Sequence, residues 1–561
     1  MQQNNNKRIV IVGGVAAGAK TAAKARREDP NAEIHVFTDE EFISYAGCGE
    51  PYFISGEVQE RDQLLARTPE QFKAVFCIDI HTQHRVTRID ANAKTIDVID
   101  CKTDAKRTEP FDVLVLATGA RPIVPRLPGI DLRGVYTLRT VPDAVRIREH
   151  VETGTVKEAF VIGGGFIGLE MVESLTARGV NVTLVEMLPQ LAPQYDADLA
   201  AHIQRAVESR GVTVMLNSPL EAMIGDENGN LKAVKIAGSE YPADLVLISC
   251  GVRPNTELAK EAGVVLGKTG AIQVNDELQT NYPFIYAAGD CAETMQMVTR
   301  KPVWVPLGST ANRQGRVLGV NVAGGNAKFP GILGTSIFRI FELNVARTGL
   351  TEKEAKEEGI DYEIVIVPVS DLPHYMPGGK NVVIKMLADR KTRRIIGAQV
   401  WGPGKVDKTI DTIATAMTFE ATVDDATQLD LAYAPPFAPP LGNAVTAANV
   451  LQNKLDRKTE GILPSEILEK EKRGDDFVLL DVRNPDEIDA VCLEKSTNIP
   501  LPQLRKRYSE LPKDKEIISS CGLGLRGSIA YRILKQLGFP NVKYLDGGVI
   551  AWPKPIPKVK K

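Results

Sequence analysis

Residues 159–186 read AFVIGGGFIGLEMVESLTARGVNVTLVE, and this stretch decides the fold class. An apolar strand runs into a loop of closely spaced glycines, a helix follows, and a second apolar strand ends in Glu186. This order is the full βαβ fingerprint of a dinucleotide site, in which the acid accepts hydrogen bonds from a ribose 2′-hydroxyl and repels a 2′-phosphate. We therefore predict NADH rather than NADPH as the ligand of this loop. The predicted contacts are Gly163, Gly165, Phe166, Ile167, Gly168, Glu186 and Gly251.

A similar strand, glycine loop and helix stand at the start of the chain. The apolar strand 7–12 leads into the loop 13–18, and an Ala-, Lys- and Arg-rich helix follows. A helix N-terminus offers free N–H groups to a pyrophosphate, although small-residue turns of this kind also serve packing alone. The strand 33–37 precedes Thr38 and Asp39, and we assign the ribose contact to Asp39. The predicted contacts are Gly13, Gly14, Ala16, Ala17, Gly18, Thr38 and Asp39.

Two further segments are expected beside a bound cofactor. The apolar strand 113–116 ends in a small-residue turn, which suggests a close backbone approach to a ligand. The segment 280–288 is predicted as a strand and closes on a Gly-Asp pair. The predicted contacts in these segments are Ala117, Thr118, Gly119, Gly289 and Asp290.

The stretch 44–52, SYAGCGEPY, holds one cysteine, Cys48, between two glycines. It follows the first dinucleotide unit, at the end of the sheet where open α/β folds bind ligands. The alternative is a buried cysteine that acts as a small hydrophobe, but the glycines, the aromatics and the two nucleotide loops favour a reactive thiol. The seven cysteines of the chain are scattered and never spaced C-x-x-C, which argues against a disulfide scaffold, a zinc site or a paired-cysteine redox motif. No metal is therefore predicted.

The two glycine loops, with the strand and Gly-Asp pair downstream, resemble the flavoprotein disulfide reductases that have two dinucleotide domains, over roughly residues 7–450. The resemblance implies FAD on the first loop, the nicotinamide nucleotide on the second, and the flavin ribityl chain on Asp290. Most members carry two cysteines in one helix turn. The pattern S-x-x-x-C-G-x-P, from Ser44 through Cys48, is instead similar to the single-cysteine branch of coenzyme A disulfide reductases and NADH-dependent persulfide reductases.

In that branch residues 331–450 would form a dimerisation domain, and a tyrosine from it reaches the active site of the partner subunit. Tyr375 and Tyr433 fall where the branch has this tyrosine. The resemblance makes both candidates for protonating the leaving thiolate. Ordinary packing of loop tyrosines is the alternative for each.

The chain departs from the branch at several positions. Gly47 stands where the branch has Asn, and Glu50 stands where it has Leu. Positions used there to bind coenzyme A phosphates are apolar here, at about Phe76 and Leu441. Glu50 beside the thiol also disfavours a polyanionic substrate. These departures leave open whether coenzyme A binds. The bases that remain as candidate substrate contacts, or as ordinary surface charges, are Lys24, Arg27 and Lys73.

The segment 463–561 resembles a rhodanese domain over its whole length. Backbone N–H groups of its glycine-rich loop can surround the sulfur of Cys521, and together with Arg526 they would stabilise a thiolate or persulfide. Both residues are therefore candidate catalytic residues. The elements that carry the resemblance are Asp481-Val482-Arg483, the Cys-x4-Arg loop from Cys521 to Arg526, Asp546-Gly547-Gly548 and Trp552.

Composition sets the remaining limits. The chain has 561 residues, 43% of them hydrophobic and 25% charged, with a net charge of −3, so nothing argues for a nucleic-acid partner. The polar start lacks the core of a signal peptide, no long apolar run appears, and we expect a cytoplasmic protein with no membrane contact. The predicted fold class is α/β. The predicted domains are FAD-binding (1–122 and 255–330), NADH-binding (123–254), α+β dimerisation (331–450), a linker (451–462) and α/β rhodanese (463–561).

The resemblance implies an FAD-dependent enzyme that uses NADH to reduce a small persulfide, a polysulfide or coenzyme A disulfide. It implies a homodimer with active sites shared between subunits, a single redox sulfur at Cys48, and a sulfane sulfur carrier at Cys521. One alternative is an NADH oxidase or peroxidase that cycles Cys48 through a sulfenic acid, although the first glycine loop lacks the histidine that peroxidases of that branch have there. The other alternative is a sulfur-carrier or redox-sensing protein.

Overall fold

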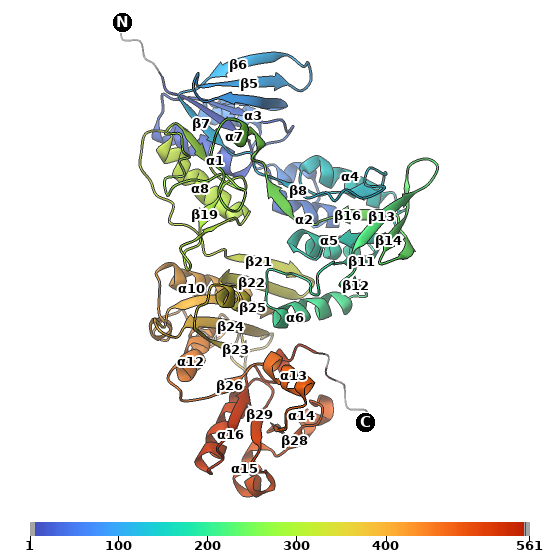
Figure 1. Ribbon diagram of the computed structural model, residues 1–561, viewed down its shortest axis with the longest axis vertical. Helices are drawn as coiled ribbons and strands as arrows, with labels where there is room; N and C mark the ends of the chain where they lie inside the picture. Colours follow the sequence, from blue (N-terminus) through green and yellow to red (C-terminus); the bar gives the residue numbers. More distant parts are fainter. Residues whose placement is uncertain (1–5, 555, 557–561) are drawn as a thin grey trace. The chain divides into compact units, whose positions relative to one another are not determined.

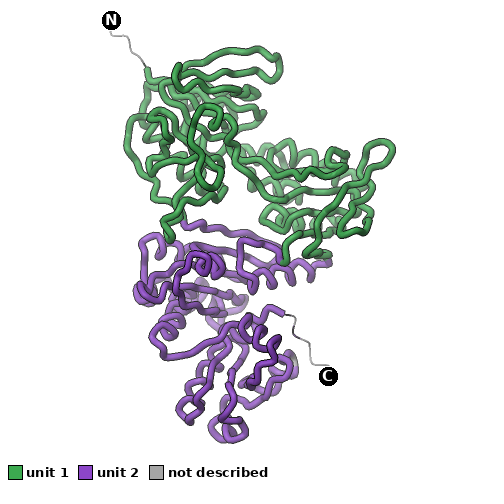
Figure 2. The backbone as a smooth tube through the Cα atoms, in the orientation of Figure 1, with its two compact units in different colours: residues 1–189, 212–332 green, residues 190–211, 333–561 purple. Residues whose placement is uncertain are grey.

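The computed structural model describes residues 6–554 and 556, and the chain forms two compact units (Figure 2). Unit 1 comprises Met1–Pro189 and Val212–Ile332, and unit 2 comprises Gln190–Gly211 and Leu333–Lys561. Unit 1 contains both glycine loops. Unit 2 contains the segments predicted as dimerisation and rhodanese domains.

Unit 1 is built on two five-stranded parallel sheets, each centred on the strand that precedes a glycine loop (Figure 1). The first sheet, in the order β18-β7-β1-β2-β3, consists of β18 (Ile285–Ala287), β7 (Val113–Leu116), β1 (Arg8–Val12), β2 (Glu33–Phe37) and β3 (Asp79–His81). The second, in the order β12-β11-β10-β16-β9, consists of β12 (Thr213–Met215), β11 (Asn181–Val185), β10 (Glu158–Ile162), β16 (Leu245–Ile248) and β9 (Val135–Tyr136). Each glycine loop therefore leaves the central strand of its sheet.

The first sheet is covered on both faces, which explains why its strands are apolar without alternation. Ile9 and Ile11 pack in one core with α1 (Ala16–Glu28) and α8 (Gly308–Asn321), whereas Val10 and Val12 point into a second core. Unit 1 also contains two three-stranded antiparallel sheets: β4 (His84–Asp90), β5 (Thr95–Asp100) and β6 (Lys106–Pro110), and β13 (Leu220–Gly225), β14 (Leu231–Ile236) and β15 (Ser239–Pro242). The strands β8 (Ala120–Pro122) and β17 (Val252–Pro254) pair antiparallel.

Over its described residues, unit 2 contains one antiparallel and one parallel sheet. The antiparallel sheet consists of β21 (Ser336–Ile340), β22 (Leu343–Gly349), β25 (Ile395–Gly402), β24 (Asn381–Asp389) and β23 (Tyr362–Ser370). The helices that pack on it are α10 (Val406–Thr418) and α12 (Asn443–Leu455). The parallel sheet consists of β26 (Gly461–Ile462), β30 (Val542–Leu545), β29 (Glu516–Ser520), β27 (Phe477–Asp481) and β28 (Thr497–Asn498). Its helices are α13 (Pro464–Arg473), α14 (Pro485–Ala490), α15 (Leu501–Arg507) and α16 (Leu525–Gln536).

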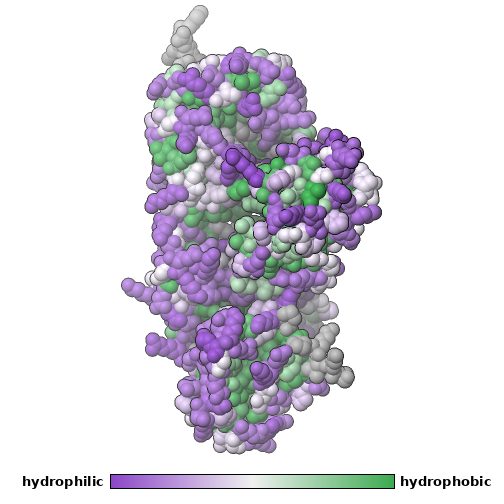
Figure 3. All heavy atoms as spheres, turned by 45° about the vertical axis from the view of Figure 1, so that its right-hand side comes forward, coloured by the Kyte–Doolittle hydropathy of each residue, from purple (hydrophilic) through white to green (hydrophobic). Residues whose placement is uncertain are grey.

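The predicted α/β fold class is confirmed by these sheets. On the face in Figure 3, hydrophilic and hydrophobic residues are interspersed over the surface. Among the described residues, no helix has both the length and the apolar character needed to cross a membrane.

A buried ion cluster joins the two sheets of unit 2. Lys454, near the end of α12, lies 2.8 Å from the carboxylate of Asp546 and 3.3 Å from that of Glu363, and its ammonium donates to the carbonyl of Ile364 at 2.6 Å. Although burial opposes it, the charges of Asp546 and Glu363 raise the pKa of Lys454. Asp546 begins the turn that follows β30, so this cluster fixes the rhodanese segment to β23 and α12.

We expect Lys454→Met to destabilise the rhodanese segment by about 3–5 kcal/mol, because it leaves the buried carboxyl group of Asp546 without its cation. The urea concentration at which proteases cut within residues 461–554 measures this loss. The matched control is Lys458→Met, which removes an exposed pair with Asp456 and is expected to cost less than about 1 kcal/mol. Equal midpoints for the two variants would contradict the structural role of Lys454.

Candidate functional site

Both glycine loops require glycine at their first position. Gly13 has φ +106° and Gly163 has φ +109°, in the left-handed region that other residues rarely adopt. A Cβ on Gly13 would lie 2.1 Å from the carbonyl oxygen of Ala117, and one on Gly163 would lie 2.4 Å from that of Ser249. The predicted turn 117–119 therefore lies directly on the first loop, and the turn that ends at Gly251 lies on the second.

The helices that follow the loops present free N–H groups to a ligand. Helix α1 and helix α5 (Phe166–Ala177) begin without a side-chain cap and without an acidic residue in the first turn. Such N-termini attract phosphate groups. The last glycine of each loop allows the helix to pack closely against the start of the loop, since a Cβ on Gly18 or Gly168 would lie 1.9 Å from the carbonyl oxygen of Gly13 or Gly163. These features fit a dinucleotide pyrophosphate at both loops.

The acids that follow the second strand of each dinucleotide unit, Asp39 and Glu186, differ in burial. Glu186 is buried and accepts hydrogen bonds from the backbone N–H groups of Gly164 at 2.8 Å and Leu188 at 2.9 Å. It therefore lies against the second glycine loop. Thr38 is buried beside the first loop, whereas Asp39 is exposed.

The Cys48 segment is held against both dinucleotide units. Ser44, with φ +47°, donates its backbone N–H to the carbonyl of Gly14 at 2.9 Å. On the other side, the hydroxyl of Ser174 on α5 donates to the carbonyl of Pro51 at 2.9 Å. Cys48 lies between these anchors in the short 3₁₀ helix Gly47–Gly49, and its side chain is accessible. Left-handed backbone at a non-glycine residue often marks a functional position.

The surroundings of Cys48 favour the thiol over the thiolate. Desolvation by the surrounding protein raises the pKa of the Cys48 thiol, and the carboxyl groups of Glu170, Asp290 and Glu50 raise it further. Arg139 opposes this shift. Any thiolate at Cys48 therefore needs a positive charge or a bound cofactor for stabilisation.

Glu50 does not carry the negative charge that its type suggests. It is 2% exposed, and burial raises its pKa to about 8, so most of it is protonated at neutral pH. The expectation that Glu50 repels a polyanionic substrate was wrong for this reason. On α5, burial likewise raises the pKa of Glu170 to about 7.

We expect Glu170→Gln to move the pH profile of Cys48 alkylation to lower pH, because the substitution removes a like charge that grows as Glu170 ionises near pH 7. The rate of iodoacetamide labelling of the NADH-reduced enzyme, measured from pH 6 to 10, tests this. Glu149→Gln, on the exposed side of α4 (Val141–Glu152), is the matched control and should leave the profile unchanged. An unmoved profile in Glu170→Gln contradicts the charge assignment.

Arg139 is a site residue that the sequence did not reveal. It precedes α4, its guanidinium donates to the carbonyl of Ala120 at 2.8 Å, and it lowers the pKa of Glu50 and Asp290 against the effect of their burial. No motif surrounds it, and it lies about 90 residues from Cys48 in the chain. Only the folded structure brings this cation to the thiol.

Asp290 lies near the first glycine loop. A Cβ on Gly289 would lie 3.0 Å from that of Ala17 on α1, so the Gly-Asp turn sits at the start of this helix. Burial raises the pKa of Asp290. Its neighbour Cys291 is fully buried and contacts the carbonyls of Leu116 and Ala288 at 3.4 Å, which agrees with a structural cysteine.

Two of the three candidate substrate bases are engaged with acids. Lys24 pairs with Glu28, and Lys73 lies 2.6 Å from Asp79. Arg27 is exposed. In unit 2, by contrast, Tyr375 and Tyr433 come together, with their hydroxyl oxygens 3.4 Å apart and their side chains 58% and 47% exposed.

The Cys521 loop surrounds its sulfur with backbone donors. Cys521 is buried, and its Sγ accepts hydrogen bonds from the N–H groups of Gly524 at 3.1 Å and Gly527 at 3.4 Å. The Asp-Gly-Gly turn supports the loop from behind, because Val549 donates its N–H to the carbonyl of Cys521 at 2.9 Å. A Cβ on Gly548 would lie 2.4 Å from that same oxygen.

Arg526 has a partner that the sequence did not reveal. Its two terminal nitrogens donate to the two carboxylate oxygens of Glu487, on α14, at 2.7 and 2.6 Å. Arg526 also interacts with Cys521, since both Glu487 and Cys521 raise the pKa of the guanidinium. The predicted catalytic arginine thus pairs with an acid and also interacts with the sulfur.

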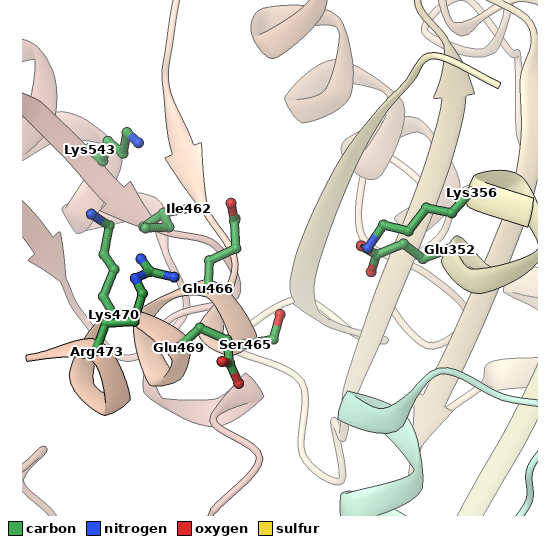
Figure 4. A pocket seen from close by; sticks show the side chains of 9 residues that line it. All are labelled: Glu352, Lys356, Ile462, Ser465, Glu466, Glu469, Lys470, Arg473 and Lys543. Carbon is green, nitrogen blue, oxygen red and sulfur yellow. The ribbon is translucent and has the colours of Figure 1, made fainter. Parts of the chain in front are cut away.

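A cavity of about 420 Å³ lies between α9 (Glu352–Glu357) and α13 (Figure 4). Its charges are already paired, for example Lys356 with Glu352 at 2.7 Å and Lys470 with Glu516 at 2.8 Å. We assign no site to it. Within the described part of the chain, no group of three or more His, Cys, Asp or Glu side chains could hold a metal ion.

Three segments of the chain match known protein families. Residues 7–315 match the pyridine nucleotide-disulphide oxidoreductases, residues 335–445 match the dimerisation domain of that family, and residues 464–554 match the rhodanese-like domain.

Similar proteins share most of the chain. An NAD(P)H coenzyme A polysulfide/persulfide reductase of Pyrococcus horikoshii is 38% identical over 453 residues, which cover 81% of this chain and 100% of the relative. A reduced CoADR-RHD of Bacillus anthracis is 40% identical with a TM-score of 0.93, covering 98% of both chains. An NAD-dependent persulfide reductase of A. fulgidus is 41% identical with a TM-score of 0.91, covering 97% of this chain and all of the other.

Proteins named NADH oxidase are also among the relatives, at 38% identity or less. The family and structure matches confirm that the chain resembles reductases fused to a rhodanese domain. The chain therefore belongs to the pyridine nucleotide-disulphide oxidoreductase family, with the family's dimerisation domain and a rhodanese-like domain that follows it.

Proposed function

We propose that this chain is an FAD-dependent NADH:persulfide reductase, acting on a small organic persulfide, a polysulfide or coenzyme A disulfide, with Cys48 as its single redox sulfur. The observation that carries the proposal is the double anchoring of the Cys48 segment, by Ser44 to the first glycine loop and by Pro51 to the helix after the second. Relatives named as persulfide reductases support a sulfur substrate.

The two loops are assigned to the two cofactors. The first loop, with Asp290, would hold FAD, and the second, with Glu186 as the acid for the ribose, would hold NADH. When bound, FAD would supply the redox chemistry that passes the two electrons of the NADH hydride to sulfur. The protein contributes the position of the thiol and the charges around it.

Cys48 performs the nucleophilic chemistry. As a thiolate it attacks the S–S bond of the substrate, a bond to Cys48 forms as the substrate's own S–S bond breaks, and the outgoing sulfur takes a proton. Arg139 favours the thiolate against the neighbouring acids. In a dimer, Tyr375 and Tyr433 of one subunit would supply the proton to the site of the other.

Cys521 would carry sulfane sulfur as a persulfide. Two backbone N–H groups already aim at its Sγ, and the guanidinium of Arg526, although paired with Glu487, also interacts with the sulfur. Since a sulfur-carrying loop has no role in plain disulfide reduction, its presence favours a persulfide or polysulfide over a disulfide as the substrate.

A steady-state NADH assay tests the proposal across coenzyme A persulfide, glutathione persulfide, polysulfide, coenzyme A disulfide, peroxide and oxygen. Turnover fastest with a persulfide or polysulfide supports it. Peroxide or oxygen consumption at matching rates would favour the oxidase alternative, and slow turnover with every substrate would favour a sulfur-carrier or sensing role.

A further inference from the structure

The charge on Arg526 is already neutralised in the folded protein. Glu487 receives two hydrogen bonds from the guanidinium, which lower the pKa of Glu487 to about 2. Glu487 is also fixed by its own helix, because one carboxylate oxygen accepts the backbone N–H of Asn484 at 3.1 Å. An anion that approaches Arg526 must therefore compete with a carboxylate that the fold holds in place.

No second cation replaces Arg526 on the loop. The residues between Cys521 and Arg526 are Gly, Leu, Gly and Leu. The nearby Arg483 is buried and paired with Asp481 at 2.6 Å. The loop thus lacks an unpaired positive charge with which to bind a small dianion.

The rim of the loop is apolar instead. Leu523, Leu525 and Ile529 are 46%, 70% and 40% exposed. Leu525 and Ile529 lie four residues apart on α16, so they share one face of this helix. Apolar side chains beside the reactive sulfur can pack against an organic group, but they give an oxyanion no favourable interaction.

We propose that Glu487 sets the donor specificity of Cys521, disfavouring thiosulfate and other sulfur oxyanions and favouring a sulfane sulfur carried on an organic group that contacts Leu523, Leu525 and Ile529. The inference rests on the proposed sulfur-carrying function of the rhodanese domain and specifies its substrate class.

The transfer step balances with such a donor. The Cys521 thiolate attacks the outer sulfur of R–S–SH, and the new bond forms as the S–S bond of the donor breaks. The electron pair of the broken bond leaves on the sulfur of R–S⁻, which takes the proton of the transferred group. The products are the Cys521 persulfide anion and the thiol R–SH, so no further oxidant or reductant is required.

The test measures kcat/KM of sulfur transfer to cyanide in the full-length enzyme with two donors, glutathione persulfide and thiosulfate. The variant is Glu487→Gln, which keeps an oxygen for the cap of α14 but removes the charge. The matched control is Glu510→Gln, which removes an exposed two-point pair with Arg507 elsewhere in the same domain. The ratio of the two kcat/KM values is the readout, because a loss of folded enzyme cancels in it.

Wild type and Glu510→Gln should prefer the organic persulfide. Glu487→Gln should shift the ratio toward thiosulfate by roughly five-fold, the size expected for one partly exposed charge. A wild-type preference for thiosulfate, or an unchanged ratio in Glu487→Gln, overturns the inference and leaves the sulfur-carrying function intact. If neither donor transfers sulfur to wild type, the proposed function of the rhodanese domain fails instead.

Discussion

Replacing Cys48 with serine should lower NADH-dependent persulfide reduction by at least about 10³-fold, because the variant loses the nucleophile and keeps every other part of the site. Serine is close to cysteine in shape, and the anchors at Ser44 and Pro51 use backbone atoms of the Cys48 segment. Flavin content should therefore equal that of wild type. The measurement is steady-state NADH oxidation with glutathione persulfide, alongside the flavin absorbance of the purified protein.

The matched control for this prediction is Cys101→Ser, which changes an exposed cysteine on a turn of the antiparallel sheet. It should retain wild-type turnover. Parental persulfide reduction by Cys48→Ser would remove the basis of the mechanism.

Replacing Cys521 with serine should abolish sulfur transfer to cyanide and leave the reductase working on a persulfide supplied in solution. Both Gly524 and Gly527 direct their N–H groups at the buried Sγ. We expect the sulfurtransferase rate to fall by at least about 10³-fold, as for other lost nucleophiles.

Serine is a suitable replacement because it preserves the hydrogen-bond acceptor within the loop. The alkylation rate of Cys48 in this variant serves as a check that unit 1 is unchanged. Residual sulfur transfer near the parental rate would assign the carrier to another thiol.

The sequence predicts those parts of the molecule that depend on neighbouring residues. Each glycine loop follows an apolar strand and precedes a helix, so Gly13 and Gly163 reveal their left-handed turns within one short stretch. Glu186 follows from the same local pattern. Cys521 is found in the same way, since its loop glycines and its arginine are adjacent in the chain.

Other parts arise from contacts between distant segments, and no local pattern predicts them. Arg139 and Glu170 reach Cys48 through the packing of α4 and α5, and Glu487 reaches Arg526 across 39 residues. Glu50 was misread because its residue type indicates a charge, whereas its burial raises its pKa to about 8. A side chain's type gives its chemistry in water, and only its surroundings give its chemistry in the fold.

The most direct test of the central claim is to trap the covalent intermediate. The enzyme is mixed with excess glutathione persulfide in the absence of NADH, quenched in acid, digested and analysed by mass spectrometry. We predict a glutathione or sulfur adduct on the peptide that contains Cys48, which disappears when NADH is added before the quench. An unmodified Cys48 peptide, with the adduct on another cysteine of unit 1, would contradict the role of Cys48 as the redox sulfur.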